Sequence, residues 1–373
     1  MKNKIFKYDF LIVGAGLVGS LAAMALHQKK YKVLVIEKNK LFPKDQRTLA
    51  VNANSRDFLK NLGVWKNLKS NFEPIEKIVI KDYINKKDLI FQNAEESMGS
   101  VIFNRSLIKI SRDYLIKNKI LLTNIDFSSL NFIPKKIVSI NSKKYFFNKA
   151  IISLGKNYEN SEKLKKNIFD KGHQAYVGFF NHQEKHNQTA YEIFTSKGPL
   201  AVLPSPNSEK KSSTFIYSTK DKMSFNKLSK LIKNNFYSSH GNINLKSSIS
   251  YYSIKPHLSR SIQKDILLIG DTAHSIHPVA GQGWNLGIKD IQALCSCLET
   301  YSIHDINFDD YFFSKRIFEN ISYLTFTNSL NFLYENKKPF TKSIIKASHF
   351  FLSQFPYLKY LFIKQAMGKI SLV

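Results

Sequence analysis

The sequence has little cysteine and no apolar run long enough to cross a membrane. Cys295 and Cys297 are its two cysteines, and two residues apart on a predicted helix they point to different faces. We therefore expect neither a disulfide nor a metal site, and a reducing compartment. The uncharged stretch from Phe10 to Leu26 contains three glycines and falls short of the roughly 20 residues that a membrane span needs. These absences predict a cytoplasmic protein that is soluble or peripheral on the inner membrane.

Acidic residues are also scarce, because 28 Asp and Glu stand against 56 Lys and Arg, giving a formal net charge of +28. Such an excess attracts nucleic acid, an anionic membrane surface or a phosphorylated cofactor. The lysines are spread along the whole chain beside abundant Asn, Ile, Phe and Tyr, so a generally basic proteome and a selected anionic partner both stay open. The chain has no RRM, zinc-finger or helix-turn-helix signature, and we expect no nucleic-acid partner.

The first 40 residues have the pattern of a dinucleotide-binding unit. A β-rich run, a helical run and a second β-rich run follow one another at Tyr8–Val13, Leu17–Gln28 and Tyr31–Glu37. Between strand and helix, three glycines stand at the spacing G-x-G-x-x-G: Gly14, Gly16 and Gly19. The first permits a tight turn, the second lets backbone N–H groups approach a pyrophosphate, and the third lets the helix pack against the strand.

An acidic residue ends the second predicted strand of this unit. The Glu37 carboxylate can accept hydrogen bonds from an adenosine ribose, and Lys38 beside it is a further candidate cofactor contact. Strand, glycines, helix, strand and terminal acid together favour a dinucleotide site over an ordinary turn. They do not distinguish NAD from FAD.

A second glycine-rich segment, GDTAHSIHPVAGQGWNLGIKD, extends from Gly270 to Asp290. It resembles the second FAD motif of the flavoprotein monooxygenases with the para-hydroxybenzoate hydroxylase fold, and is most similar to the ubiquinone-biosynthesis hydroxylases. The resemblance implies that Asp271 accepts a hydrogen bond from a ribityl hydroxyl. It also implies that the N-terminus of a helix starting near Trp284 favours negative charge on the flavin ring. The residues expected around the ring are Pro278, Gly281, Gln282, Gly283 and Asn285.

Two histidines in this segment, His274 and His277, have no third ligand at a sensible spacing, so we expect no metal. Hydrogen bonding near the cofactor is the favoured role, and acid/base catalysis is the alternative. No side chain is assigned as catalytic, because in this family the flavin performs the oxygen chemistry.

The resemblance covers most of the chain and implies further contacts. Asp45–Trp65 is similar to the segment whose arginine reaches the flavin nucleotide, a role that falls on Arg47. SVIFNRSLI places Asn104 and Arg105 near FAD, and Thr189–Pro206 resembles the strands that face the flavin ring. Ala366–Gly368 is similar to the end of the family's chains.

One motif of the family is missing. Members usually have an Asp-Gly motif that serves FAD and NAD(P)H, whereas Ser153–Lys166 contains Gly155 without the aspartate. The resemblance therefore implies FAD as the cofactor and NAD(P)H as the reductant, and the missing aspartate leaves the choice of reductant open.

The predicted fold class is α/β, a Rossmann-type FAD-binding domain with an interleaved β-sheet substrate domain and C-terminal helices. With 43% apolar residues, 373 residues can bury such a core. Glycine-, proline- and serine-rich breaks suggest these divisions. The FAD-binding domain takes 1–75, 100–165 and 259–305, the substrate domain takes 76–99 and 166–258, and the helical region takes 306–373.

The resemblance implies that NAD(P)H reduces FAD, that O2 adds at flavin C4a, and that the hydroperoxide hydroxylates the ring of a polyprenylated phenol or quinone precursor. Alternatives are a reductase or dehydrogenase of the same fold, and a non-catalytic FAD-binding subunit of a quinone-biosynthesis complex. A polyprenyl substrate would sit in a bilayer. The tail Pro339–Lys364 mixes apolar residues and lysines without acids, which fits an interfacial helix or a plain packed helix equally.

Overall fold

The computed structural model describes most of the chain: residues 5–40, 47–69, 71–81, 84, 87–125, 136–155, 164–168, 172–206, 209–261, 263–278, 281–336 and 338–370. Three features discussed above lie partly outside these residues. They are the stretch that replaces the Asp-Gly motif (156–163), the start of the segment Asp45–Trp65 (45–46), and two residues of the predicted flavin-ring loop (279–280).

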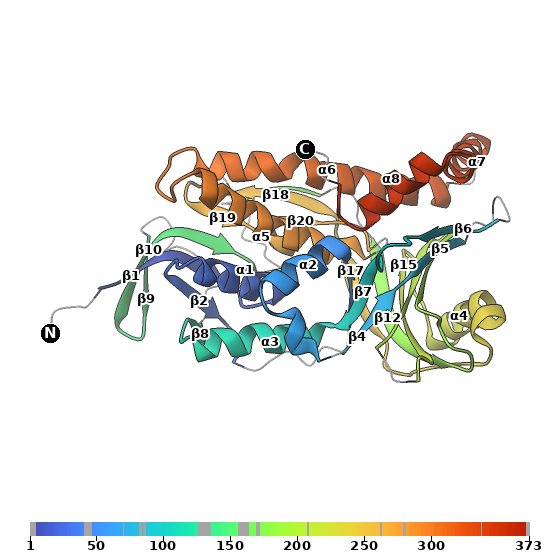
Figure 1. The fold of residues 1–373 in the computed structure, drawn as a ribbon, viewed down its shortest axis with the longest axis horizontal. Helices are drawn as coiled ribbons and strands as arrows, with labels where there is room; N and C mark the ends of the chain where they lie inside the picture. Colours follow the sequence, from blue (N-terminus) through green and yellow to red (C-terminus); the bar gives the residue numbers. More distant parts are fainter. Residues whose placement is uncertain are drawn as a thin grey trace.

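A mainly parallel sheet forms the left half of the molecule in Figure 1 and has the strand order β19-β10-β1-β2-β8, with β9 antiparallel to β10. Alternate residues of β1 face opposite sides: Phe10 and Ile12 pack with α1, α3 and α5, while Leu11 and Val13 join a second core. The bounds are β1 Ile5–Val13, α1 Leu17–Gln28, β2 Val33–Glu37, α3 Asn104–Lys117, β8 Leu121–Thr123, β9 Ile137–Ile140, β10 Lys143–Ile152, β19 Ile266–Leu268 and α5 Gln282–Thr300.

An eight-stranded sheet forms the other half, with the order β16-β12-β15-β14-β13-β5-β6 and β17 paired to β12. One face packs on α4, where Leu228, Ile232 and Phe236 meet the sheet. The bounds are β5 Lys77–Lys81, β6 Leu89–Gln92, β12 His173–His182, β13 Thr189–Thr195, β14 Gly198–Pro204, β15 Ser212–Thr219, α4 Phe225–His240, β16 Ile243–Leu245 and β17 Ser250–Ile254.

Two three-stranded sheets join the halves, with the orders β3-β7-β4 and β11-β18-β20. Helices α6, α7 and α8 follow α5, and α6 extends from the Rossmann half to the eight-stranded sheet (Figure 1). The remaining bounds are β3 Thr48–Asn52, α2 Ala53–Asn61, η1 Trp65–Leu68, β4 Phe72–Ile75, β7 Gly99–Phe103, β11 Leu164–Ile168, β18 His257–Ser261, η4 Gly270–Thr272, β20 His274–Ser275, α6 Phe308–Glu335, α7 Pro339–Gln354 and α8 Pro356–Ala366.

The predicted fold class is confirmed, and the helix predicted over Leu17–Gln28 has those bounds. Strands β5 and β6, from 76–99, join the sheet built from 166–258, as interleaved domains require. The domain limits themselves stay a prediction. The helical spacing after Asp309 gives three helices, because Pro339 and Pro356 have no N–H for an intrahelical bond and stand in the first turns of α7 and α8.

Candidate functional site

The three glycines of the first motif have different neighbours. Gly14 has φ +101°, and a Cβ there would lie 2.4 Å from the carbonyl oxygen of Ser153. A Cβ on Gly19 would lie 2.1 Å from the carbonyl oxygen of Gly14, so both positions exclude any side chain. A Cβ on Gly16 would meet nothing within 4 Å, and no side chain caps the helix that starts after it. This open space before uncapped N–H groups fits a pyrophosphate.

Glu37 is buried at the end of β2, beside the glycine turn. Its carboxylate accepts hydrogen bonds from the backbone N–H of Ala15 at 2.7 Å and of Asn39 at 3.0 Å. Arg112 of α3 lies 3.3 Å from the same carboxylate, and its Nε donates to the Ala15 carbonyl at 2.8 Å. Glu37 is therefore held in place with lone pairs still available to a ribose. Lys38 is exposed beside it.

Arg112 was missed by the sequence analysis. The pKa of its guanidinium is lowered by burial, with Glu37 opposing that effect. The available signal was a cation at a core-facing position of an amphipathic helix, since Leu107, Ile108, Ser111 and Leu115 are buried on the same face.

The predicted nucleotide contacts Arg47, Asn104 and Arg105 lie near one another, where β3 begins and β7 ends. The backbone N–H of Asn104 donates to the carbonyl of Arg47 at 2.9 Å. Arg47 is exposed, and its guanidinium lies 4.8 Å from the ring centre of Tyr252 in the eight-stranded sheet. The exposed Arg105 lies over Phe103 at 5.1 Å. Their direct contacts with a cofactor stay predictions.

Asp271 lies in η4, directly after β19, and is half-buried without a hydrogen bond to any described residue. The turn that holds it is tied down by Asp290 of α5. That carboxylate accepts from the Gly270 N–H at 2.8 Å and lies 2.7 Å from His274 Nε2. His274 therefore has the structural role that the sequence analysis favoured.

The predicted flavin-ring loop ends where α5 begins. Gly281 has φ +64°, and a Cβ there would lie 2.7 Å from Ala50 Cβ. Asn285 holds this approach, because its Nδ2 donates to the carbonyls of Ala50 and Gly281 at 3.0 Å each, while Oδ1 accepts from Asn52 N–H. A Cβ on Gly283 would meet only Ile276 at 3.8 Å.

Helix α5 has no acidic residue in its first turn and no side-chain cap, so its positive end stays uncompensated. Pro278, at the other end of the described loop, is half-buried. Both amide hydrogens of Asn285 are taken by backbone carbonyls, so the structure gives it a role in positioning the loop.

The two glycine motifs meet in space. Val18, inside the first motif, packs against two glycines of the second. A Cβ on Gly270 would lie 3.2 Å from a methyl of Val18, and a Cβ on Gly287 would lie 2.7 Å from it. Turns more than 250 residues apart in sequence therefore lie side by side, as binding of one extended dinucleotide by both would require.

Residues 366–368, near the C-terminus, contact both α2 and the start of α5. The backbone N–H of Asn54 donates to the Met367 carbonyl at 3.0 Å. Gln282 Nε2 donates to the Ala366 carbonyl at 3.4 Å. Gly368, at φ +70°, leaves room for Asn52, whose Nδ2 would lie 2.6 Å from a Cβ there. The resemblance of 366–368 to the family's ending thus falls on a segment that contacts the flavin-loop helix.

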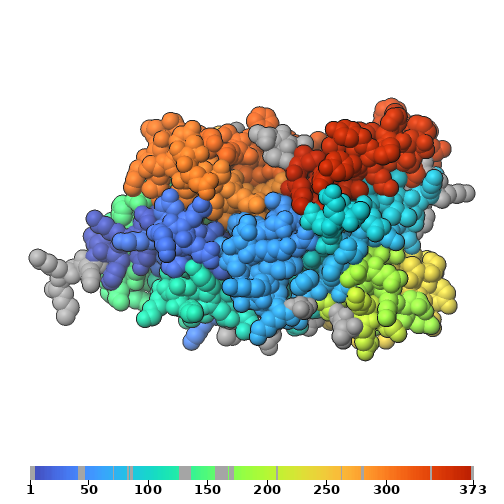
Figure 2. Space-filling view, in the orientation of Figure 1, coloured from blue at the N-terminus to red at the C-terminus, as the bar shows by residue number. Residues whose placement is uncertain are grey.

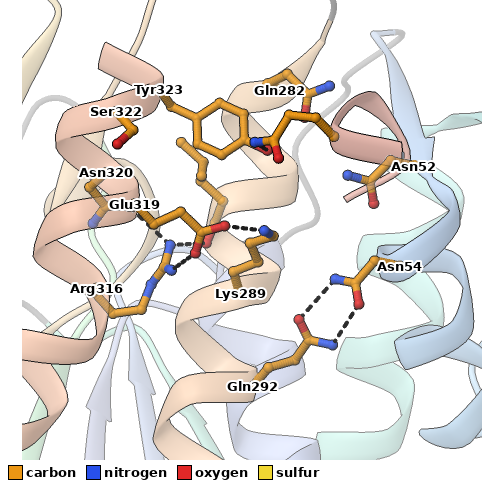
Figure 3. A network of polar contacts seen from close by, with 12 residues as sticks. Asn52, Asn54, Gln282, Lys289, Gln292, Arg316, Glu319, Asn320, Ser322 and Tyr323 are labelled. Carbon is orange, nitrogen blue, oxygen red and sulfur yellow. Dashed lines mark hydrogen bonds and ion pairs between the residues drawn. The ribbon is translucent and has the colours of Figure 1, made fainter. Parts of the chain in front are cut away.

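A buried ion network connects α5 to α6 (Figure 3). Arg316 donates from Nε to Asp290 at 2.8 Å and also pairs with Glu319, which pairs with Lys289 of α5. Asn320 accepts from Arg316 at 2.9 Å. Burial alone would raise the pKa of Asp290, but His274 and Arg316 hold it below the ordinary value. The network thus holds Asp290 in place, and Asp290 in turn fixes the turn that contains Asp271.

The eight-stranded sheet presents its second face to this loop. Tyr191 and Ile193 of β13 pack on the α4 side, so Ala190 and Phe194 face the other way. Ala190 lies in a cluster with Ala50, the residue that Gly281 approaches. Ala190 therefore connects this face of the sheet to the residue that the loop approaches. His277 of the loop packs edge-on against His173 of β12, with 4.9 Å between ring centres.

The comparisons with known proteins agree with this geometry. A family model described as "FAD binding domain" matches residues 7–104 and 178–301. The chain is 24% identical to "Ubiquinone hydroxylase UbiM" of Neisseria meningitidis, over 78% of this chain and 68% of that protein. It is 26% identical to "Ubiquinone hydroxylase UbiL" of Rhodospirillum rubrum, over 78% and 72%.

Solved structures share the fold. p-Nitrophenol 4-monooxygenase PnpA from Pseudomonas putida superposes with a TM-score of 0.75 at 13% identity, covering 99% of this chain and 100% of that one. The flavin-dependent brominase Bmp2 gives a TM-score of 0.74 at 14% identity, covering 97% and 94%. With most of the chain matched by the FAD binding domain model, this protein belongs to the FAD-dependent aromatic-ring monooxygenases, in the family that includes the ubiquinone-biosynthesis hydroxylases.

Proposed function

We propose that this enzyme hydroxylates the aromatic ring of a polyprenylated phenol in ubiquinone biosynthesis. The observation that supports this most is the meeting of the two glycine motifs at Val18, beside a sheet whose Ala190 packs in one cluster with Ala50 of the flavin-loop contact. The names of the relatives support the pathway. One oxygen atom of O2 enters the new C–OH group, and the other leaves as water, formed with the two electrons and one proton of the hydride from NAD(P)H and a second proton from solvent.

FAD, when bound, supplies the activation of O2. Gly16 and the uncapped start of α1 would hold its pyrophosphate, Glu37 its ribose, and Asp271 its ribityl chain. The uncompensated N-terminus of α5 would stabilise negative charge at the ring. The protein's own task is to hold the substrate ring near this edge and to exclude water, which limits the loss of oxygen as hydrogen peroxide.

Two measurements test the proposal. The purified protein should be yellow, with absorbance near ~450 nm as a bound flavin gives, and should couple O2 uptake to NAD(P)H oxidation when a prenylated phenol is added. A deletion strain should accumulate one under-hydroxylated prenylphenol. A yellow protein that consumes electrons from the substrate without O2 would identify a dehydrogenase instead.

The missing Asp-Gly motif favours a second candidate, a FAD-binding subunit without its own catalysis. Such a protein would be yellow but would be reduced by neither NADH, NADPH nor a ferredoxin-type donor. The deletion strain separates the two candidates, because a catalytically dead Asp271→Ala variant would still complement it if the role were scaffolding.

We further propose that the C-terminal hairpin of α7 and α8 (residues 338–366) docks on an anionic lipid surface. It has no acidic residue, and several of its aromatic rings are exposed, among them Phe340 at 73%, Phe350 at 57% and Tyr357 at 69%. Exposed lysines, Lys342 and Lys346, stand on the same helix as Phe340 and Phe350. Aromatic rings with lysines beside them match an anionic interface in polarity and in charge.

This hairpin is fixed to the substrate sheet by its other side. His349 donates to the Lys87 carbonyl at 2.9 Å, and Phe362 packs on Phe91 of β6 with 4.8 Å between ring centres. Figure 2 shows the hairpin (red) as one corner of the surface, beside β5 and β6. In the parts of the chain that the structure describes, no helix is long and apolar enough to cross a bilayer. Docking would thus place the substrate sheet near a lipid-borne ring.

Vesicle co-sedimentation tests the docking. We expect binding to vesicles with anionic lipid at low salt and weaker binding at high salt. The double variant Phe350→Ser/Phe351→Ser should lose most of it, whereas Tyr237→Ser, an exposed aromatic of α4, should not. Absence of binding at both salt concentrations would rule the surface out, and a dimer that Phe350→Ser/Phe351→Ser dissociates would assign it to a second copy.

A further inference from the structure

The C-terminal half of α6 lies between the flavin loop and the substrate sheet. At one end of this half, Tyr323 and Leu324 pack with Ile276 of the loop. At the other end, Tyr334 stacks on Phe194 of β13, with 4.4 Å between ring centres. The helix between these two contacts therefore borders the space where loop and sheet face each other.

Two asparagines occupy that intermediate stretch. Asn331 continues the buried stripe of Tyr323 and Thr327 at four-residue spacing, and only 5% of it is exposed. Among the residues that the structure describes, neither its Nδ2 nor its Oδ1 has a hydrogen-bond partner, and the buried Oδ1 of Asn328 has none either. A buried amide without partners is costly to the fold, so its presence points to a ligand that supplies them.

The charge of this stretch limits what that ligand can be. Between Glu319, which is paired with Arg316, and Glu335, α6 has no charged residue. On the facing side of β13, the buried Glu192 shares the strand face of Ala190 and Phe194. The ionisable group that these two faces contribute is thus an acid. A carboxylated ring would be repelled, while a neutral hydroxyl could both donate to Oδ1 and accept from Nδ2 of an amide.

We propose that Asn331, supported by Asn328, binds the oxygen substituent of a neutral phenolic ring and sets the orientation of that ring toward the flavin loop. The inference rests on the proposed hydroxylase function and specifies its substrate as an uncharged phenol without a ring carboxylate. A polyprenyl chain then provides the apolar part of the binding, and the amide selects the ring position that is presented.

Substitution of Asn331 tests this in the FAD-loaded enzyme, with a geranylated phenol and with 4-hydroxybenzoate as probes. The wild type should bind the geranylated phenol at least tenfold more tightly than the carboxylated ring. Asn331→Leu should raise KM tenfold or more, and a larger share of the NAD(P)H consumed should yield hydrogen peroxide. Asn331→Gln should restore part of the coupling.

Thermal stability separates a ligand-binding role from a structural one. Asn331→Leu breaks no hydrogen bond in the protein, so its Tm should equal or exceed that of the wild type. Asn320→Leu on the same helix removes a partner of Arg316 and should lower Tm instead. Unchanged KM and coupling in Asn331→Leu, or a fall in its Tm, would overturn the inference. A wild type that oxidises neither probe while holding FAD would count against the hydroxylase function itself.

Discussion

The two halves of α6 differ in whether all of their buried polar side chains have hydrogen-bond partners. In the first half, Arg316, Glu319 and Asn320 are buried, and each has a partner within the protein. In the second half, Asn328 and Asn331 have buried amide atoms without a partner in the described parts of the chain. One helix thus contains a stretch in which these buried side chains are all paired and a stretch in which two buried amides are not, beside the paired Thr327 and Tyr323.

The comparison teaches how to separate residues that serve the fold from residues that serve binding. A buried polar group left unpaired costs about 1–3 kcal/mol, so a fold retains it only where something else benefits. Substitutions in the first half should therefore lower stability and affect catalysis indirectly. Substitutions of the unpaired Asn328 and Asn331 should affect substrate handling and leave stability unchanged or improved.

Loss of Arg316 should have the largest effect on stability. Arg316→Met leaves the carboxylates of Asp290 and Glu319 buried with one cation fewer, which we expect to cost about 3–5 kcal/mol. Because Asp290 also holds Gly270 and His274, FAD affinity should fall as well. Denaturant unfolding of the apoprotein and flavin titration measure the two effects.

Lys315→Met is the matched control, since Lys315 precedes Arg316 and is only half-buried, with a bond to Ser296 at 2.9 Å. We expect a change within about 1 kcal/mol, as for other solvent-accessible cations. Equal losses in the two variants would mean that the buried network contributes nothing specific.

The same contrast should appear within the first glycine motif, with a smaller effect. Gly14→Ala forces a Cβ against the Ser153 carbonyl at positive φ and should destabilise the apoprotein by roughly 2–4 kcal/mol. Gly16→Ala meets no protein atom, so the apoprotein should keep its stability within about 0.5 kcal/mol. FAD affinity of Gly16→Ala should drop at least tenfold, measured by flavin fluorescence. An apoprotein destabilised equally by both variants would contradict the contrast.

The sequence predicted the site best where chemistry follows a fixed spacing along the chain. The G-x-G-x-x-G turn, Glu37 and the segment around Asp271 could be located because each depends on neighbours in sequence. Arg112 and Arg316 could not, since their partners, Glu37 and Asp290, are 75 and 26 residues away and depend on tertiary packing.

The fold shows the same division. Strands β13 and β14 lie within Thr189–Pro206, which the resemblance to the family's strands predicted, whereas α3 and α4 were not named in advance. The apolar positions of α4, such as Leu228, Ile232 and Phe236, are separated by lysines and asparagines that mask the helical stripe. No sequence signal marks Asn331 as unpaired, because that depends on which polar groups the tertiary packing brings near its amide.

A third region tests the distinction between paired groups that serve the fold and unpaired groups that serve binding. On the α4 side of the substrate sheet, His182, His186 and His240 pack together, with 4.6 Å between the rings of His182 and His240. The buried Nε2 of His240 has no partner among the described residues, although it lies away from the flavin loop. Unpaired basic nitrogens differ from unpaired amides, however, because acid can protonate them.

Replacement of His240 should therefore change the acid stability of the protein and not its catalysis. Burial, together with His182, Lys81 and His186, lowers the pKa of His240 from 6.5 to about 3. Burial lowers that of His186 to about 4. As pH falls below about 6.5, the unfolded chain binds protons first, so each such histidine removes up to about 1.4 kcal/mol of stability per pH unit.

His240→Phe keeps an aromatic ring against Phe180 and Phe236 and removes the group that titrates. Between pH 6.5 and 4.5 the free energy of unfolding of this variant should fall less steeply than that of the wild type. The slopes should differ by about 1.4 kcal/mol per pH unit, the value for one proton. Urea unfolding across this range measures it, and KM at pH 7.5 should not move. A changed KM with an unchanged pH slope would instead place this cluster among the ligand-binding groups, and the distinction drawn along α6 would fail there.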